Sequence, residues 1–477
     1  MADTMIQLGE FHPFEAGDQR FLYLVPSAAV IRLDEASAGV VSVLEGGPKA
    51  AGDISESLAD LFETSEVHAA ISELLQVKAV GVADEPKKPM LKVLPTSVPL
   101  QTMVLNVTSK CNLACTYCYE YGEDKVVDDP EKAMPRFLDE KTARTSVDFM
   151  FHQAGANPIV NLTFFGGETL LNFPVLQSTL AYANTKAEKL GKRVQFSLTT
   201  NATLLKPEII EWMIENEVGV TVSIDGPKEM QDRFRVYHNG KGSYDVALPK
   251  IKELLQRHTA KPIGARVTLT RQNLDIIGIY RHLTEEVGFQ QVGFAPVTTA
   301  DGRDYAISDG EGGYDIMLQQ FQALAWEFLE HTLAGKYHGF SNITETLQEI
   351  HKGVSKAYPC GAGVGLVGVA TDGQVGLCHR FAGSEEHRLG SVQEGIDKER
   401  QSDFLDRNHL ANKTDCHSCW ARPLCSGGCY HEAHTRYGST TNANLHYCDW
   451  IRTWTHTCLE VYGELAERAP ALLDRLN

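Results

Sequence analysis

The chain has 477 residues, of which 43% are hydrophobic and 22% are charged, so it can bury large cores and divide into about three domains. Its formal net charge of −18 argues against nucleic acid as a partner, because neutralising phosphates requires a basic surface. No basic segment followed by an apolar one opens the sequence, and no uninterrupted apolar run reaches the roughly 18 residues of a membrane span. We therefore expect a cytoplasmic protein without a membrane partner.

Residues 1–92 are predicted to form a small N-terminal domain. The apolar runs FLYLVP and AAVIRLD are typical of strands, and ASAGVVSVLEGG is typical of a helix that ends at Gly46 and Gly47. DISESLADLF and SEVHAAISELLQVKAV have the apolar spacing of two amphipathic helices. This combination resembles the winged-helix domain with which ribosomal-peptide maturases recognise a leader peptide; an accessory domain packed on the core is the alternative. The proline-rich connector DEPKKPMLKVLPTSVPL marks the boundary that follows.

Strand-like and helix-like segments alternate through residues 93–335. The strand-like runs are TMVLNVT, IVNLTFF, VQFSLTT, GVTVSID, GARVTLT and VGFAPVT. Such a repeat predicts an α/β fold with a parallel sheet. Because distinctive residues gather where these strands end, as in barrels whose loops carry the chemistry, we expect a partial (β/α)6 barrel rather than a flat doubly wound sheet.

The run CNLACTYC, directly after the first of these strands, places Cys111, Cys115 and Cys118 on one short loop. Three thiolates can hold three irons of a [4Fe–4S] cluster and leave the fourth iron open. A structural zinc loop is the alternative, although such sites usually close with four protein ligands. The cysteines are confined to two regions of a long chain, which indicates reduced thiolates rather than disulfides. The spacing resembles the signature of the radical S-adenosylmethionine (SAM) family, whose members bind SAM at the open iron.

The resemblance to the radical SAM family continues at the next strand ends and implies where SAM binds. FFGGETLLN matches the motif for the amino group of SAM, with close backbone approach at Gly166 and Gly167 and with Glu168 as acceptor; a glycine turn is the alternative. The resemblance also implies ribose contacts from Thr200, Asn201, Ser223 and Asp225, a contact with the SAM carboxylate from Arg266, and an adenine contact from Tyr117. The alternatives are an internal ion pair for Arg266 and simple packing of the loop for Tyr117.

After the fourth strand, DGPKEMQDRFRVYHNGKGSY resembles a pattern in the peptide-modifying branch of the family. The resemblance makes Arg235 the candidate catalytic residue, near the substrate channel. A salt bridge that stabilises the loop is the alternative for Arg235.

A second cysteine region lies in residues 336–477 and resembles the loop-rich SPASM domain, which holds two auxiliary iron–sulfur clusters. The run CHSCWARPLCSGGC carries most of the likeness. The resemblance assigns Cys360, Cys378 and Cys429 to auxiliary cluster I, and Cys416, Cys419, Cys425 and Cys448 to auxiliary cluster II. Zinc ribbons are the alternative.

Two complete clusters need eight ligands, so cluster I lacks one, and Leu366 stands about where some relatives carry an extra cysteine. Cys458 lies in an apolar, helix-like stretch and is expected to be a buried small hydrophobe. Asp372 and His379 are other candidate ligands. The sharper hypothesis is that the fourth iron of cluster I is open to a substrate thiolate.

The resemblance as a whole implies an enzyme with three [4Fe–4S] clusters that cleaves SAM to a 5′-deoxyadenosyl radical. Its partners are expected to be a polypeptide substrate with a leader segment and a low-potential electron donor such as flavodoxin or ferredoxin. The layout, including the CYEYGED loop, is most similar to the maturase family of quinohemoprotein amine dehydrogenase. That family links cysteine sulfur to methylene carbons of aspartate or glutamate in the dehydrogenase small subunit. The alternatives are a sulfatase-type maturase that forms formylglycine and a non-catalytic electron carrier or zinc scaffold.

Overall fold

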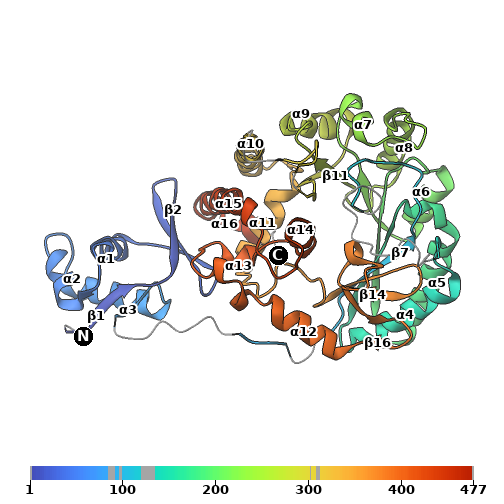
Figure 1. Cartoon of the computed structure of the whole chain (residues 1–477). Coiled ribbons are helices and arrows are strands. Elements are labelled where there is room, and N and C mark those ends of the chain that lie inside the picture. The colour runs from blue at the N-terminus through green and yellow to red at the C-terminus, as the bar shows by residue number, and fades with distance from the viewer. Residues whose placement is uncertain are drawn as a thin grey trace.

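The computed structural model describes residues 3–83, 92–95, 99–119, 135–300, 302–307 and 312–474. Most of the proline-rich connector and the CYEYGED run beyond Tyr119 lie outside these residues. Within the described residues, no helix has the length and apolar character needed to cross a membrane. Figure 1 shows a small N-terminal unit beside a larger body that curves around a central sheet.

The larger body contains a ten-stranded sheet, of which six adjacent strands are parallel and lie in chain order. These strands are β7 (Thr102–Thr108), β8 (Ile159–Gly166), β9 (Arg193–Thr200), β10 (Gly219–Ser223), β11 (Gly264–Leu269) and β12 (Gln291–Pro296). All six correspond to predicted strands, with ends that differ by two residues at most. A doubly wound sheet would reverse its strand order near the middle, so the sequential order is that of an open barrel.

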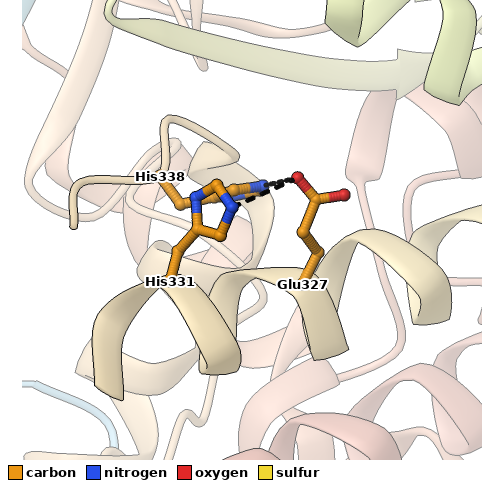
Figure 2. Close-up of side chains that lie close together, drawn as sticks. All are labelled: Glu327, His331 and His338. Atoms are coloured by element: carbon orange, nitrogen blue, oxygen red, sulfur yellow. Dashed lines mark hydrogen bonds and ion pairs between the residues drawn. The ribbon is translucent and has the colours of Figure 1, made fainter. Parts of the chain in front are cut away.

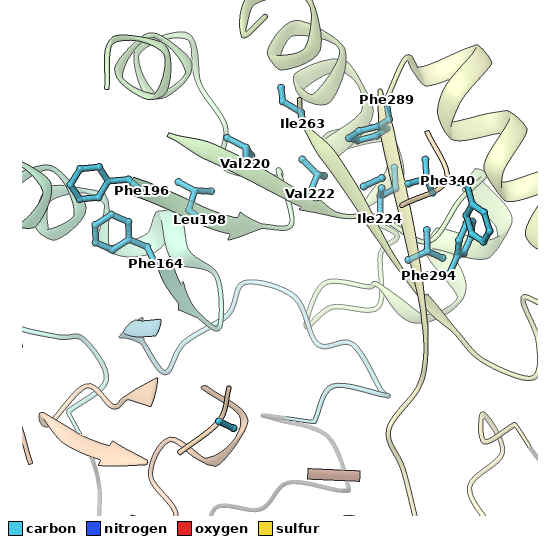
Figure 3. Close-up of a cluster of buried hydrophobic side chains, with 14 of the residues drawn as sticks. Phe164, Phe196, Leu198, Val220, Val222, Ile224, Ile263, Phe289, Phe294 and Phe340 are labelled. Carbon is cyan, nitrogen blue, oxygen red and sulfur yellow. The ribbon is translucent and has the colours of Figure 1, made fainter. Parts of the chain in front are cut away.

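The parallel strands alternate between two environments. Val220 and Val222 of β10 are buried, whereas Thr221 and Ser223 of the same strand face a cavity. Figure 3 shows the buried set running across neighbouring strands, with Phe164 of β8 and Leu198 of β9 beside these valines. Side chains of successive residues point to opposite faces of a sheet, so one face makes the core and the other is left for chemistry.

Helices cover the core face of the parallel strands. They are α4 (Glu140–Ala154), α5 (Phe173–Lys189), α6 (Pro207–Glu215), α7 (Lys228–Phe234), α8 (Tyr244–Arg257), α9 (Ile276–Arg281), α10 (Gly313–Leu333) and α11 (Ser341–His351). Shorter helical turns are η1 (Thr169–Asn172), the π-helix η2 (His282–Val287), η4 (His379–Phe381), η5 (Leu410–Asn412), η6 (Thr414–Cys416) and η7 (Leu445–Tyr447). Asp139 caps α4, because its carboxylate accepts the Thr142 backbone N–H at 2.7 Å.

The C-terminal segment extends the barrel sheet, which the sequence analysis did not predict. Strand β13 (Leu366–Val369) pairs in parallel with β7, and β14 (Gln374–Gly376), β15 (Arg388–Ser391) and β16 (Gly395–Ile396) follow in antiparallel order. Helix α11 begins after the predicted boundary at residue 335, yet its Asn342 side chain accepts the backbone N–H of Phe294 in β12 at 2.9 Å. The predicted boundary is therefore not a break in packing.

The N-terminal unit has a core of its own. Its strands β1 (Met5–Leu8), β5 (Lys49–Ala50) and β6 (Val80–Val82) form one sheet beside α1 (Glu35–Glu45), α2 (Ala51–Ser57) and α3 (Thr64–Gln76). A second sheet contains β2 (Phe11–Ala16), β3 (Gln19–Leu24) and β4 (Ala29–Arg32). The predicted third helix is too long by four residues, because Val80 pairs with Leu8 of β1 instead.

The second N-terminal sheet packs on the long C-terminal helix α15 (Cys448–Arg468). Gly463 permits this contact, because a Cβ there would lie 2.6 Å from the Cβ of Ala16. The His12 ring stacks on Trp420 at 3.6 Å between centroids and shares a 2.9 Å hydrogen bond with His456. The remaining helices are α12 (Lys398–Asn408), α13 (Arg422–Cys425), α14 (Tyr430–Tyr437) and α16 (Pro470–Leu473).

Candidate active site

A cavity of ≈ 570 Å³ lies at the C-terminal ends of the parallel strands. Cavities of this size hold cofactors and drug-sized ligands. The predicted site residues on its wall are Cys111, Cys115, Tyr117, Cys118, Gly166, Gly167, Thr200, Asn201, Ser223, Arg235 and Arg266. Two predicted residues, Glu168 and Asp225, are buried behind the wall, with exposed fractions of 1% and 0%.

The cysteine loop after β7 supplies three free thiols to this cavity. Burial, together with a smaller effect of neighbouring thiols such as Cys118, raises the pKa of Cys111 and of Cys115 to about 12. Buried thiols of this kind lose their protons to a bound metal. The donor set therefore fits three irons of an iron–sulfur cluster, and the adjoining cavity has room for a further ligand of the fourth iron.

The surroundings of Cys111 fix the position of the loop. Its sulfur accepts the backbone N–H of Leu113 at 3.4 Å and the side-chain amide of Asn201 at 3.8 Å. His238 contacts the Cys111 carbonyl oxygen through Nε2 at 3.0 Å. The backbone N–H of Ala114 donates to the carbonyl oxygen of Val236 at 2.7 Å. The sequence analysis expects a ribose contact from Asn201, whereas in the structure its amide joins the end of β9 to the cysteine loop.

Glu168 joins the ends of β8 and β9. Its carboxylate accepts the Thr200 hydroxyl at 2.6 Å, the Asn201 backbone N–H at 2.8 Å and the Leu170 N–H at 3.1 Å. The sequence analysis expects this carboxylate to meet a ligand ammonium, and in the structure protein donors already hold it in place. At Gly166 the close approach is to Thr108 of β7, because a Cβ would lie 2.3 Å from the Thr108 carbonyl oxygen.

Tyr117, Asp225 and Arg235 form a buried network beside the cavity. The Asp225 carboxylate accepts the Tyr117 hydroxyl, an Nη2–H of Arg235 at 3.2 Å and the Thr268 backbone N–H at 3.1 Å. Nε of Arg235 lies 2.9 Å from the same carboxylate and completes the ion pair. The Arg235 guanidinium also lies over the Tyr117 ring, 5.5 Å from its centroid. Burial raises the pKa of the Tyr117 hydroxyl, which keeps it a neutral donor.

Arg235 forms the salt bridge of its simpler interpretation and also lines the cavity, and its catalytic role stays a prediction. The expected ribose contact of Asp225 stays a prediction, and in the structure its carboxylate accepts from Tyr117, Arg235 and Thr268. Tyr117 packs the loop as its simpler interpretation predicted, against Phe234 and Val297.

Two further guanidinium groups reach the cavity from different parts of the chain. Arg266 of β11 has no hydrogen bond or ion pair with any described residue, although Glu345 of α11 acts on it electrostatically. Arg380 follows Cys378, donates to the Thr298 hydroxyl at 2.8 Å and lies 4.6 Å from the Tyr119 ring centroid. The two guanidinium groups repel each other, so the positive charge of Arg380 lowers the pKa of Arg266. An anion bound between Arg266 and Arg380 would relieve this repulsion, so this part of the cavity attracts anions.

Seven further thiols lie in the C-terminal segment and fall into the two groups that the sequence analysis assigned. In the first, the thiols of Cys360 and Cys429 raise the pKa of Cys378, and that of Cys429 raises the pKa of Cys360. In the second, each thiol acts electrostatically on the other three; its members are Cys416, Cys419, Cys425 and Cys448. Burial is the largest cause of the raised pKa of Cys378, about 12, and of Cys416, about 11.

Cys458 belongs to neither group. It is fully buried within the core on α15 and hydrogen bonds with Thr346, as expected for a small hydrophobe. Of the other candidate ligands, Asp372 caps the β13–β14 turn by accepting the Gln374 N–H at 3.0 Å. The His379 ring lies in the cavity wall, 4.5 Å from the Phe165 ring.

A cluster of polar side chains on α10 and the turn after it lies outside the cavity (Figure 2). Oε1 of Glu327 lies 3.3 Å from Nε2 of His338 and 3.9 Å from Nε2 of His331. These three residues have the ligand atoms of a metal site. Arg281, however, donates to both Glu327 oxygens, at 2.7 and 2.5 Å, so the carboxylate is already paired. The cluster ties α9 to α10 and is a structural ion-pair network.

Comparisons with known proteins agree with this geometry. Residues 105–274 match the model of the Radical SAM superfamily. The chain is 27% identical over 363 residues to a serine-type anaerobic sulfatase-maturating enzyme of Bacteroides thetaiotaomicron, covering 70% of this chain and 83% of that protein. It is 23% identical to a cysteine-type anaerobic sulfatase-maturating enzyme of Clostridium novyi, covering 74% and 94% of the two chains. The solved structure described as native anSMEcpe with bound AdoMet has a TM-score of 0.65 at 21% identity, covers 77% of this chain and 99% of that one, and shares the fold.

Proposed function

Starting from the radical SAM domain in residues 105–274, we propose that this enzyme modifies a polypeptide by abstracting hydrogen from one of its carbon atoms. The observation that carries the proposal is the set of three free thiols on the wall of a ≈ 570 Å³ cavity, with seven more thiols in two further groups. A non-catalytic electron carrier has no use for such a cavity. The relationship to two anaerobic sulfatase-maturating enzymes supports a protein substrate.

When bound, a [4Fe–4S] cluster and SAM supply the reductive cleavage of SAM to methionine and a 5′-deoxyadenosyl radical. Cys111, Cys115 and Cys118 would hold that cluster. Arg266 would pair with the SAM carboxylate, since it is the guanidinium in the cavity without a protein partner. Gly166, Gly167 and Ser223 line the space for SAM. We assign positioning roles to Glu168 with Thr200 and Asn201, and to Asp225 with Tyr117 and Arg235.

The more specific proposal is thioether formation, in which a substrate cysteine sulfur bonds to a methylene carbon of aspartate or glutamate. One C–H and one S–H bond break and one C–S bond forms. The hydrogen atom leaves with the 5′-deoxyadenosyl group, the thiol proton leaves as H⁺, and one electron must be taken from the substrate. The seven C-terminal thiols would hold two auxiliary [4Fe–4S] clusters able to accept that electron.

Two observations support a substrate with a thiol and a carboxylate. The group of Cys360, Cys378 and Cys429 offers three thiols where a complete cluster takes four, so a substrate sulfur can be the fourth ligand. Arg380 lies between that group and the cavity, and its guanidinium can bind a carboxylate in two-pronged fashion. On this basis we keep the small subunit of a quinohemoprotein amine dehydrogenase as the proposed substrate.

The N-terminal unit is proposed to recognise a leader segment of the substrate. Its chain order of strand, helix, strand, two helices and strand, apart from the inserted β2–β4 sheet, is that of a winged helix and supports this role. We propose that the enzyme works in the cytoplasm with a flavodoxin or ferredoxin as reductant.

Formylglycine formation is the second candidate function, because the named relatives are sulfatase-maturating enzymes. It oxidises a cysteine or serine side chain and forms no bond between two residues. It also needs no open position on an auxiliary cluster.

The deciding experiment is anaerobic incubation of the reconstituted enzyme with SAM, a reductant and a candidate small-subunit polypeptide, followed by mass spectrometry. Thioether formation predicts loss of two hydrogens per crosslink and a cysteine that iodoacetamide cannot alkylate. A formylglycine product, which reacts with hydrazides and carries no crosslink, would overturn the thioether proposal and leave the radical SAM assignment intact.

A further inference from the structure

Lys413 is a buried lysine with almost no protein partner. Its residue is 4% exposed, and its Nζ makes one hydrogen bond, to the Asn442 carbonyl oxygen at 3.5 Å. In the described part of the chain, no carboxylate forms an ion pair with it. Burying an ammonium is costly unless a negative group compensates the charge. The described part of the protein therefore supplies no carboxylate that balances the charge of Lys413.

Three contacts place Lys413 between the two groups of C-terminal thiols. Its backbone carbonyl accepts the N–H of Cys416 at 2.9 Å, which anchors it to the second group. Its ammonium lies 5.4 Å from the centroid of the Tyr430 ring, and Tyr430 directly follows Cys429 of the first group. Its side chain packs on Gly427, where a Cβ would lie 2.7 Å from Cδ of Lys413.

The charge of Lys413 reaches both groups. It acts electrostatically on the thiols of Cys416 and Cys425 in one group and of Cys360 and Cys429 in the other. Other cations near these cysteines form ion pairs with acidic residues or act on only one of the two thiol groups. Lys356, which acts on Cys360, pairs with Glu349 at 2.6 Å, and Arg452, which acts on Cys419, pairs with Asp449.

We propose that Lys413 is the shared counter-charge of the two auxiliary clusters and raises the reduction potential of both. This inference rests on the proposed function, in which each thiol group holds an iron–sulfur cluster. Thiolate-ligated clusters are anionic and become more so on reduction, so a nearby fixed cation favours the reduced form. A cation that acts on both clusters shifts both potentials in the same direction, so it favours reduction of both without opposing electron transfer between them.

The test is a redox titration of the reconstituted holoenzyme followed by electron paramagnetic resonance, with wild type, Lys413→Met and Lys413→Arg. We expect Lys413→Met to lower the potentials of both auxiliary clusters, each by at least about tenfold in the equilibrium constant for one-electron reduction, which is about 59 mV. The cluster of Cys111, Cys115 and Cys118 is the internal reference and should not move. Lys413→Arg should keep the wild-type potentials. Lys356→Met is the matched control, since its charge is already balanced by Glu349.

Iron content decides the other outcomes. Unchanged auxiliary potentials in Lys413→Met at full iron content would overturn the role of Lys413 while leaving the clusters established. If Lys413→Met loses auxiliary iron and Lys413→Arg keeps it, the charge is required for assembly and the proposal is supported. If both variants lose iron equally, the side chain acts by packing and the proposal is wrong. Wild type that holds only about 4 irons per chain would overturn the two auxiliary clusters on which this inference rests and leave the cluster of Cys111, Cys115 and Cys118 standing.

Discussion

The two cysteine regions use the same ligand chemistry in different surroundings. The loop with Cys111, Cys115 and Cys118 borders a ≈ 570 Å³ cavity at the barrel mouth. Of the seven C-terminal thiols, none is on the wall of this cavity, and the buried Lys413 lies between their two groups. An iron beside the cavity can bind SAM, whereas the C-terminal groups are proposed to accept electrons and, at the group of Cys360, Cys378 and Cys429, a substrate sulfur. The difference teaches that the surroundings of the thiols, rather than the thiols themselves, divide bond chemistry from electron transfer.

Removing one thiol of the barrel loop is expected to have the largest effect. Cys115→Ala should lose about 4 irons per chain and weaken SAM binding more than about 100-fold, since even outer partners of metal ligands are worth ~10–100-fold. Iron analysis and equilibrium binding of radiolabelled SAM measure both. Cys458→Ala is the matched control: this thiol belongs to the core, so iron should be unchanged. Equal iron content in wild type and Cys115→Ala would show that Cys115 is not a ligand of the cluster and would contradict this prediction.

The C-terminal thiols are expected to matter for turnover and not for SAM cleavage. Cys360→Ala should lose auxiliary iron and peptide crosslinking, while 5′-deoxyadenosine is still formed at a rate within about tenfold of wild type. The reason is that the cavity wall, which carries Cys111, Cys115 and Cys118, does not include Cys360, Cys378 or Cys429. Chromatographic assay of 5′-deoxyadenosine beside mass spectrometry of the peptide separates the two effects. A parallel loss of both would show that the two regions are not functionally distinct.

The arginines of the cavity sharpen the comparison, because one is paired and one is not. Arg235→Gln leaves the fully buried Asp225 carboxylate without its cation and should cost about 3–5 kcal/mol of stability, seen as a large fall in thermal midpoint. Arg266→Gln removes no ion pair, so it should leave the midpoint almost unchanged and raise the KM for SAM. The reverse ranking in thermal melts would contradict the assigned positioning role of Arg235.

The smallest expected effect concerns the ion-pair network on α10. Burial lowers the pKa of His338 to about 4, so the folded protein keeps this ring neutral while the unfolded chain protonates near the ordinary value of 6.5. Stability should therefore fall as the pH drops from about 6.5 towards 4, by up to ~1.4 kcal/mol per pH unit. Comparing thermal midpoints of wild type and His338→Phe at pH 7.5 and 5.5 measures this contribution. His152→Gln, at an exposed site on α4, should show the wild-type pH dependence.

Local patterns explain why much of the fold was predictable. The six parallel strands are runs of β-branched and apolar residues between helices, and the pattern is complete within each segment. The strands β13–β16 were missed because they have only two to four residues each, and β13 joins them to β7 from more than 250 residues away, as Leu366 pairs with Thr102. Sequence separation of this size leaves no local signal.

The site shows the same division. Two of the cysteine groups were readable from spacing, because Cys111, Cys115 and Cys118 lie on one loop and Cys416, Cys419 and Cys425 lie close together in sequence. The grouping of Cys360, Cys378 and Cys429 came only from the resemblance. The partners of Glu168 and Asp225 could not be predicted from the sequence, because Thr200 and Arg235 reach these carboxylates from other elements. Arg380 and Lys413 were missed altogether. The one signal for Lys413 was the glycine pair after Cys425, whose first member, with a φ of +85°, leaves room for the lysine side chain.

The most direct test of the central claim is formation of 5′-deoxyadenosine by the anaerobically reconstituted, reduced enzyme. We predict that wild type converts SAM to equal amounts of methionine and 5′-deoxyadenosine. No 5′-deoxyadenosine from a preparation with complete iron and sulfide, or zinc in place of iron on the loop of Cys111, Cys115 and Cys118, would contradict the account.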